Sequence, residues 1–148
     1  MIVRPRVDDD LDRCVEALRL VHDADSYPLN WPESPRAWLE AADAAWVAEL
    51  DGELVGHAAV MGHELCRLFV VPAARRLPLS VGRALVEQVR AHVAGALTLN
   101  VVDEQRSGAV AFYEATGWRF THTTDAAFTR PDGGPVRLRH YELPDGLR

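Results

Sequence analysis

Lysine is absent from this sequence of 148 residues, because all 16 basic residues are arginines. Its absence excludes chemistry that passes through a lysine Schiff base, and it excludes the phosphate-binding lysine of a Walker loop. Cysteine is scarce as well, with only Cys14 and Cys66. Two cysteines make no disulfide framework, so we expect a reducing, cytoplasmic location.

Long apolar runs are also missing, since no run approaches the roughly 18 residues of a membrane-spanning helix. Residues 1–10 lack the basic start and the apolar stretch of a secretion signal. Sixteen basic against 22 acidic residues give a net charge of −6, which disfavours nucleic acid as a partner and suits an amine-bearing one. We therefore expect no membrane and no nucleic-acid partner, and the length suits one domain over residues 1–148.

Apolar periodicity and turn residues predict alternating strands and helices. A helix is expected from Leu11 with Asp8 to Asp10 as capping acids, and a second from Pro35 after a proline-rich loop. Asp51-Gly52 predicts a tight hairpin. The strands are expected at 1–6, 45–50, 54–61, 66–71, 97–102, 118–124 and 136–143, and the later helices at 81–94 and 107–116.

The order of these elements predicts an α/β fold, of the α+β mixed-sheet kind. Segment 66–71 leads through a helix into 97–102 with no room for a hairpin, so these two strands are expected to be parallel. Antiparallel N-terminal strands thus run into a parallel strand–helix–strand unit, with helices on both faces of the sheet. Residues 68–71 are apolar at every position, which predicts a strand covered on both faces.

The loop after segment 66–71 has the composition of an anion site. Arg75 and Arg76 precede a helix that opens at Ser80-Val81-Gly82. Backbone N–H groups at a helix start bind pyrophosphate, a glycine allows close approach, and arginines add charge-assisted contacts. The alternative is that Ser80 is an ordinary N-cap and that the two arginines are solvated.

The chain resembles the GNAT superfamily of acyl-CoA-dependent N-acyltransferases from Ile2 to Leu143. Residues 70–85 are similar to the family's strand ending V-x-P, followed by R-x-x-G-x-G or A and a helix. Ser80 stands in place of the first glycine, and the loop after Arg76 is one residue longer. The later stretch resembles A-x-x-F-Y-x-x-x-G-F, with Arg106 in place of a frequent Asn and with matches at Ala109, Phe112, Tyr113, Gly117 and Trp118.

This resemblance implies acetyl-CoA as the acyl donor and no metal. Its pantetheine arm would insert between 68–71 and 97–102 like an added strand, using the N–H and C=O groups of Phe69 and Val71. The N–H of Val70 would stabilise the oxyanion. The residues implied in cofactor binding are Phe69, Val70, Val71, Arg75, Arg76, Ser80, Val81, Gly82, Arg83, Asn100 and Arg106.

The resemblance also implies two catalytic residues. Tyr113 would protonate the departing thiolate, although a packing role in its helix is the alternative. Glu64 stands where many family members carry the general base. His57 and His63 are alternatives that titrate near neutrality, and a water-mediated or absent base stays open as well.

Acceptor recognition in the superfamily falls to the first two helices and their connection. Tyr27 and Trp31 would form a stacking or cation–π wall, and Asp23 and Asp25 would hold an amine. His57 is a further expected substrate-binding residue. The alternative is that these aromatic rings pin the loop to the core.

The expected function is transfer of an acetyl group from acetyl-CoA to a primary amine of a small molecule or peptide. The alternatives are a catalytically silent acyl-CoA sensor or partner module, and a domain that no longer admits the cofactor. His63 and Cys66 lack the further ligands of a zinc site. Pairing of edge strands, frequent in this superfamily, would give a homodimer.

Overall fold

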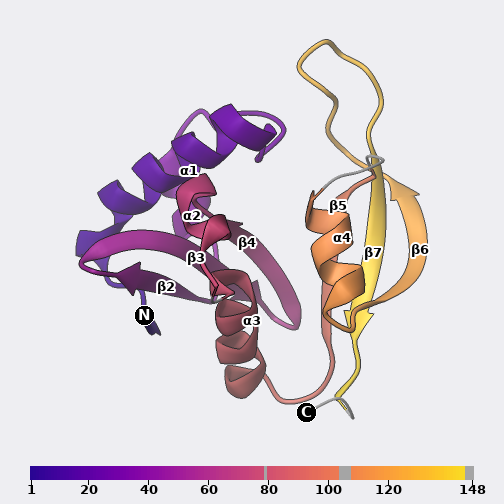
Figure 1. Cartoon of the computed structure of the whole chain (residues 1–148). Coiled ribbons are helices and arrows are strands. Elements are labelled where there is room, and N and C mark those ends of the chain that lie inside the picture. Colours follow the sequence, from indigo (N-terminus) through magenta and orange to yellow (C-terminus); the bar gives the residue numbers. More distant parts are fainter. Residues whose placement is uncertain (79, 104–107, 146–148) are drawn as a thin grey trace. The chain divides into compact units, whose positions relative to one another are not determined.

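The computed structural model describes residues 1–78, 80–103 and 108–145 (Figure 1). Its contacts divide the chain into two compact units, Met1–His92 and Val93–Arg148. Within the described residues, no helix has both the length and the apolar composition needed to span a bilayer.

The first unit contains an antiparallel sheet with strand order β1-β2-β3-β4. Its strands are β1 (Ile2–Pro5), β2 (Ala44–Leu50), β3 (Glu53–Met61) and β4 (Glu64–Val70). Its helices are α1 (Leu11–Asp25), α2 (Pro35–Glu40) and α3 (Val81–His92), with short 3-10 turns η1 (Asp8–Asp10) and η2 (Pro72–Arg76).

Helices cover opposite faces of this sheet. A Cβ atom on Gly56 of β3 would lie 2.9 Å from side-chain atoms of both Val81 and Leu85, so a glycine lets α3 approach this closely. The next residue, His57, points to the other face, where its ring contacts Arg6. Helix α2 lies on that face too, because the same guanidinium group donates to the Leu39 carbonyl at 2.9 Å.

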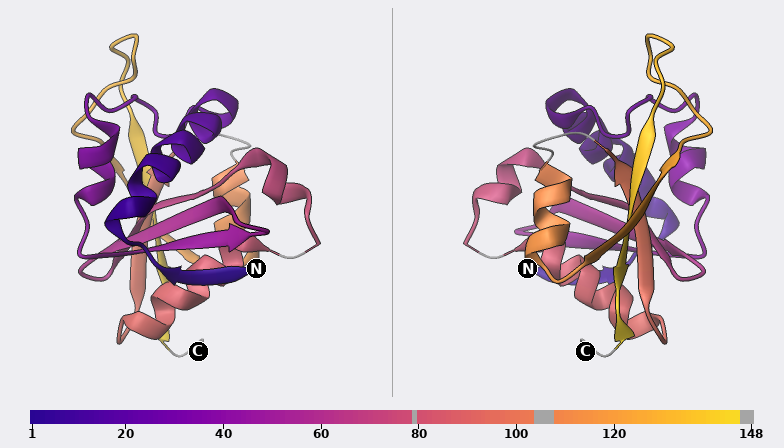
Figure 2. Two further views of the ribbon diagram at one scale, coloured as in Figure 1. Left: turned by 90° about the vertical axis from the view of Figure 1, so that its left-hand side faces the viewer. Right: turned by 90° about the vertical axis from the view of Figure 1, so that its right-hand side faces the viewer.

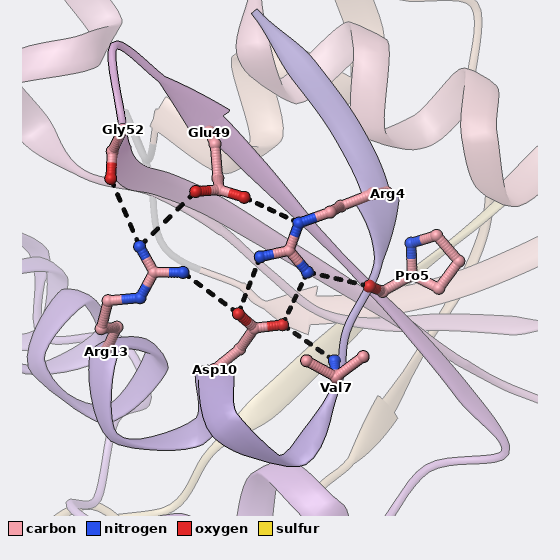
Figure 3. A network of polar contacts seen from close by, with 7 residues as sticks. All are labelled: Arg4, Pro5, Val7, Asp10, Arg13, Glu49 and Gly52. Carbon is pink, nitrogen blue, oxygen red and sulfur yellow. Dashed lines mark hydrogen bonds and ion pairs between the residues drawn. The ribbon is translucent and has the colours of Figure 1, made fainter.

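The predicted helix from Leu11 is confirmed, and its buried face consists of Leu11, Cys14, Ala17, Leu18 and Val21. Asp10 stands at the predicted N-cap position of α1, but its carboxylate makes no cap bond to that helix. It accepts instead from the backbone N–H of Val7, at the start of η1, and from the guanidinium groups of Arg4 and Arg13 (Figure 3). These contacts join β1 to α1, and Glu49 on β2 completes the network by accepting from Arg4 at 2.7 Å.

The second unit contains β5 (Leu97–Val102), α4 (Gly108–Ala115), β6 (Arg119–Asp125) and β7 (Arg137–Leu143). The strands are antiparallel, and β7 pairs with both β5 and β6. The predicted hairpin of the last two strands is confirmed, and its long connection extends beyond the strand ends in both views of Figure 2. Gly117, with φ of 94°, ends α4 as expected.

Two local predictions in the first unit have different outcomes. The hairpin at Asp51-Gly52 is confirmed, with φ of 51° and 82° as a two-residue turn requires. Complete burial of residues 68–71 is wrong, because Leu68 and Val70 are only half-buried. Side chains alternate along the strand, and of these four residues only Phe69 and Val71 are buried, with the Phe69 ring stacked on that of its cross-strand neighbour His57. The expected parallel pairing of 66–71 with 97–102 stays a prediction.

Candidate active site

The main chain at the end of β4 has a defined direction. The N–H of Val71 donates to the Val55 carbonyl at 2.9 Å, and Val70 pairs with Gly56. Backbone groups of successive residues point to opposite sides of a strand, so the groups of Val70 point away from β3. The expectation that Val71 offers a freed N–H to the pantetheine arm is therefore wrong, and by the same alternation Phe69 also faces β3. The N–H and C=O of Val70 are the groups that point away from β3.

A bulge interrupts β4 just before this end. Arg67 has φ of 49°, and Arg67 and Leu68 together lie opposite Ala58. His57 holds the bulge, because its Nδ1 lies 2.8 Å from the Arg67 carbonyl oxygen. Its Nε2 lies 3.0 Å from Arg6 Nη1. A guanidinium group only donates, so Nε2 accepts, and Nδ1 carries the proton and donates to the Arg67 carbonyl.

His57 is wrong both as a substrate-binding residue and as the general base. Its side chain is fully buried, and its ring stacks on Phe69 with centroids 5.0 Å apart. Burial, with a smaller contribution from the charges of Arg6 and Arg67, lowers the pKa of His57 to about 4, and the bond to the Arg67 carbonyl only partly opposes this. The ring is neutral at physiological pH and has no nitrogen left for a substrate.

Glu64 and Val70 lie at opposite ends of β4. Glu64 pairs with Met61 beside the turn that contains His63, whereas Val70 pairs with Gly56. Six residue steps along a strand span about 20 Å, far beyond the reach of a glutamate side chain. One reaction centre therefore cannot use the Val70 N–H as oxyanion donor and Glu64 or His63 as a direct base.

The loop after β4 brings together two residues that were expected in different subsites. Arg75 Nη2 lies 2.6 Å from Asp25 Oδ2, at the end of α1. Arg75 Nε also donates to the Val70 carbonyl at 3.0 Å. The predicted phosphate ligand thus binds the predicted amine ligand and the edge of β4. Asp23 is exposed.

The start of α3 keeps part of its predicted character. Ser80 is the N-cap, because its Oγ accepts from the Arg83 N–H at 3.1 Å. The N–H groups of Val81 and Gly82 belong to the first turn, which has no intrahelical acceptors. Arg76, which precedes this turn, and Arg83, which belongs to it, are both exposed. A phosphate group suits this arrangement. Arg106, the other expected cofactor residue, lies outside the described residues.

Tyr27 and Trp31 each pack on a different partner rather than on one another. The ring of Tyr27 meets Trp38 edge-on at 6.2 Å, and burial raises the pKa of the Tyr27 phenol. Trp31 has the Arg19 guanidinium 4.2 Å over its ring, which is the position that an acceptor cation would take. These contacts favour the loop-packing alternative.

Arg67 and Trp38, which lie on the α2 side of the sheet, had no functional role predicted from the sequence. Arg67 lies 4.1 Å over the Trp38 ring and donates from Nε to the Trp38 carbonyl at 3.2 Å. Arg67 and Arg6 thus bind successive carbonyls, of Trp38 and Leu39, at the C-terminal end of α2, where positive charge is favourable. No sequence pattern marks Arg67, and the pattern around Trp38 indicates only an ordinary core residue.

In the second unit, Tyr113 is buried within a group of aromatic rings. Its ring lies 5.7 Å from that of Trp118 and 6.1 Å from that of Tyr141. Tyr141 also fixes α4, because its hydroxyl donates to Glu114 at 3.0 Å. This position fits both the catalytic and the packing role expected for Tyr113. Asn100 is exposed on β5.

Within the described ranges, no group of three or more His, Cys, Asp or Glu side chains could hold a metal ion. Burial raises the pKa of both thiols, that of Cys14 to about 11 and that of Cys66 in the same direction. Neither thiol is therefore a ready nucleophile.

The fold is that of known N-acetyltransferases. An aminoglycoside 6'-N-acetyltransferase solved with coenzyme A matches 98% of this chain and 97% of its own, at 17% identity and a TM-score of 0.76. The ribosomal-protein-S18-alanine N-acetyltransferase of Escherichia coli matches 97% of this chain and 92% of its own, at 19% identity and a TM-score of 0.72. The apo form of YjaB from Escherichia coli matches 97% of this chain and 98% of its own, at 27% identity and a TM-score of 0.68.

A family model described as the acetyltransferase (GNAT) domain matches residues 41–120, which is more than half of the chain. The chain belongs to the GNAT acetyltransferase family. No curated protein matches the sequence. The resemblance inferred from residues 70–85 and 99–118, and the α/β fold class with it, are confirmed.

Proposed function

We propose that this protein transfers an acetyl group from acetyl-CoA directly to a primary amine of a small molecule or peptide. The observation that carries the proposal is the family match over residues 41–120, which includes β4, the start of α3 and Tyr113. Similar structures that cover nearly the whole chain support its action as one acyltransferase domain. The free thiols of Cys14 and Cys66 suit a cytoplasmic location.

In this proposal the first turn of α3 binds the pyrophosphate of the donor. The N–H groups of Val81 and Gly82 donate to the phosphate oxygens, and Arg76 and Arg83 add positive charge. Arg106 and Asn100 are further proposed contacts of the donor. The N–H of Val70 points away from β3 and stabilises the oxyanion of the tetrahedral intermediate.

The chemical step is direct attack of the amine nitrogen on the thioester carbonyl carbon. The C–N bond forms, the C–S bond breaks, and Tyr113 gives its proton to the sulfur that leaves. The amine loses its proton to water, since His57 is buried and Glu64 lies at the far end of β4. The raised pKa values of the two thiols support direct transfer over a covalent intermediate.

A second function is favoured by two observations at the donor loop. The Ser80 hydroxyl oxygen accepts the capping bond of α3, and Arg75 forms an ion pair with Asp25. Both features suit a catalytically silent module that binds acyl-CoA as a sensor.

Release of free thiol from acetyl-CoA over a panel of amines separates these functions. The panel contains an aminoglycoside, amino acids, polyamines and peptides with a free N-terminus. Turnover with at least one amine is the expected result. No turnover, combined with a melting temperature raised by acetyl-CoA, would favour the sensor. The absence of binding heat with coenzyme A in calorimetry would exclude both the acetyltransferase and the sensor function.

A further inference from the structure

The peptide unit between Val70 and Val71 is held on both sides. Its N–H donates to the Val55 carbonyl of β3 at 2.9 Å. Its C=O, on the side of β4 away from β3, accepts from Arg75 Nε at 3.0 Å. Strand pairing explains the first bond, whereas the second comes from a side chain of the following loop.

Arg75 is itself held in place by α1. Its Nη2 lies 2.6 Å from Asp25 Oδ2, so different nitrogens of one planar group serve Asp25 and Val70. Both side chains are about 40% exposed, at 41% and 40%, and such pairs add little to stability. The pair orients the guanidinium group. Because this group is planar, fixing Nη2 on Asp25 also fixes the direction in which Nε donates to the Val70 carbonyl.

We infer that Arg75, held by Asp25, is a positioning residue for the main chain of β4 at Val70 and is not a phosphate ligand. The inference rests on the proposed acetyl transfer, in which the Val70 N–H stabilises the oxyanion. Fixing the C=O of Val70 restricts rotation at that residue and so fixes the direction of its own N–H. A donor of this kind acts only when its direction is set before the reaction.

The neighbouring arginine provides the contrast. Arg76 is exposed and makes no hydrogen bond or ion pair with any residue in the described ranges, so its charge is available to a ligand. The contacts to Asp25 and Val70 use Nη2 and Nε of Arg75, so a phosphate that displaced neither partner would have to bind through Nη1. The two adjacent arginines therefore have different roles.

Four variants of the full chain test this assignment, namely Arg75→Gln, Arg75→Lys, Asp25→Asn and Arg76→Gln. Calorimetry gives the Kd for coenzyme A, and thiol release gives kcat and KM with the best amine of the panel. Arg137→Gln is the control, because it removes an ion pair of similar length, 2.7 Å to Asp125, elsewhere on the surface.

Arg75→Gln and Asp25→Asn are expected to lower kcat on the order of tenfold and to leave the Kd for coenzyme A unchanged. Arg76→Gln is expected to weaken the Kd on the order of fivefold with kcat retained. Arg75→Lys is expected to stay slow, since an ammonium group lacks the fixed directions of a guanidinium. Arg137→Gln is expected to match the wild type.

Three outcomes of the binding and kinetic measurements overturn the inference. A weakened Kd with normal kcat in Arg75→Gln would make Arg75 a phosphate ligand. A tightened Kd would make it a blocking contact. Wild-type kcat in Arg75→Lys would show that charge alone matters.

A measurement without turnover keeps this test separate from the proposed function. Amide hydrogen exchange at Val71, followed by NMR, is expected to quicken on the order of tenfold in Arg75→Gln and Asp25→Asn but not in Arg137→Gln. If the wild type acetylates no amine but this exchange result holds, the proposed function fails and the positioning contact stands. Unchanged exchange at Val71 overturns the inference whatever the activity.

Discussion

The imidazole of His57 is surrounded by protein on all sides, between the Arg6 side chain and the Arg67 carbonyl. Burial and two nearby positive charges lower its pKa to about 4 from an ordinary 6.5. A sequence places a histidine on a strand but does not say what covers it. For that reason a residue that looks suited to acid–base chemistry is a structural residue here.

Stability is expected to depend on His57 between pH 6.5 and 4. In this window the unfolded chain takes up a proton and the folded chain does not, so the free energy of unfolding falls as the pH falls. The loss from this residue is on the order of 3 kcal/mol. Urea unfolding at a series of pH values measures it.

His57→Asn removes this titration, and its unfolding free energy is expected to vary less over the same pH range. His63→Asn, which changes an exposed histidine, is the control and is expected to keep the wild-type dependence. Equal pH dependence in His57→Asn and the wild type would contradict the assignment.

Tyr113→Phe keeps the ring within its aromatic group and removes only the hydroxyl. If that hydroxyl protonates the leaving thiolate, kcat falls on the order of tenfold to a hundredfold. The Kd for coenzyme A, measured by calorimetry, is expected to change little. Full activity in this variant would leave Tyr113 with a packing role alone.

At the scale of elements, the attachment of β1 to α1 depends on Asp10. Its carboxyl group is buried and binds Arg4 and Arg13, and the Arg4 contact holds the pKa of Asp10 far below 3.8. Asp10→Asn leaves the arginines without their shared anion. The free energy of unfolding is expected to fall by about 3 kcal/mol.

Asp9→Asn, at an exposed neighbouring acid, is the matched control and is expected to change stability by less than about 0.5 kcal/mol. Because folding lowers the pKa of Asp10, its contribution is present above pH 3.8 and is lost as the pH falls further. Chemical unfolding at pH 7 and pH 3 checks both points. Equal losses in the two variants would argue against the network.

The contact between α3 and β3 depends on Gly56. Gly56→Ala places a Cβ 2.9 Å from atoms of Val81 and Leu85, and is expected to cost about 1–3 kcal/mol. Gly108→Ala at the start of α4 is the control, because its Cβ meets nothing within 4 Å. That change is expected to be neutral or stabilising, by up to about 1 kcal/mol. Thermal unfolding compares the two, and a neutral Gly56→Ala would be the contrary result.

The sequence predicts elements that depend on local signals and fails where distant residues decide. The bounds 97–102 and the start of α2 at Pro35 are correct, since a β-branched run and a Ser-Pro cap act locally. The position of β7 between β5 and β6 follows from pairing across a long connection, which no local pattern specifies. The partnership of Arg75 with Asp25 is equally distant in sequence.

For the whole molecule, the charge of −6 opposes a polyanionic donor at long range. Binding must then depend on short-range contacts, because charges beyond about 8 Å are screened at physiological salt. The family's donor is thus expected to be held by local N–H groups and arginines rather than by the overall field.

Coenzyme A is expected to stabilise the folded chain by mass action. At a hundred times its Kd it raises the free energy of unfolding by about 2.7 kcal/mol. Melting curves over a series of coenzyme A concentrations measure this shift, and adenosine, which carries no phosphate, is the control ligand. A melting temperature that does not change with coenzyme A would contradict donor binding.

The single tautomer of His57 supplies a spectroscopic reporter beside the proposed reaction centre. Its Nδ1 proton is shielded from water and bound to the carbonyl of the bulge residue, so its exchange with solvent is slow. A resolved downfield proton resonance is the consequence. Any donor or acceptor analogue that reshapes the bulge will shift that signal, even when no product forms.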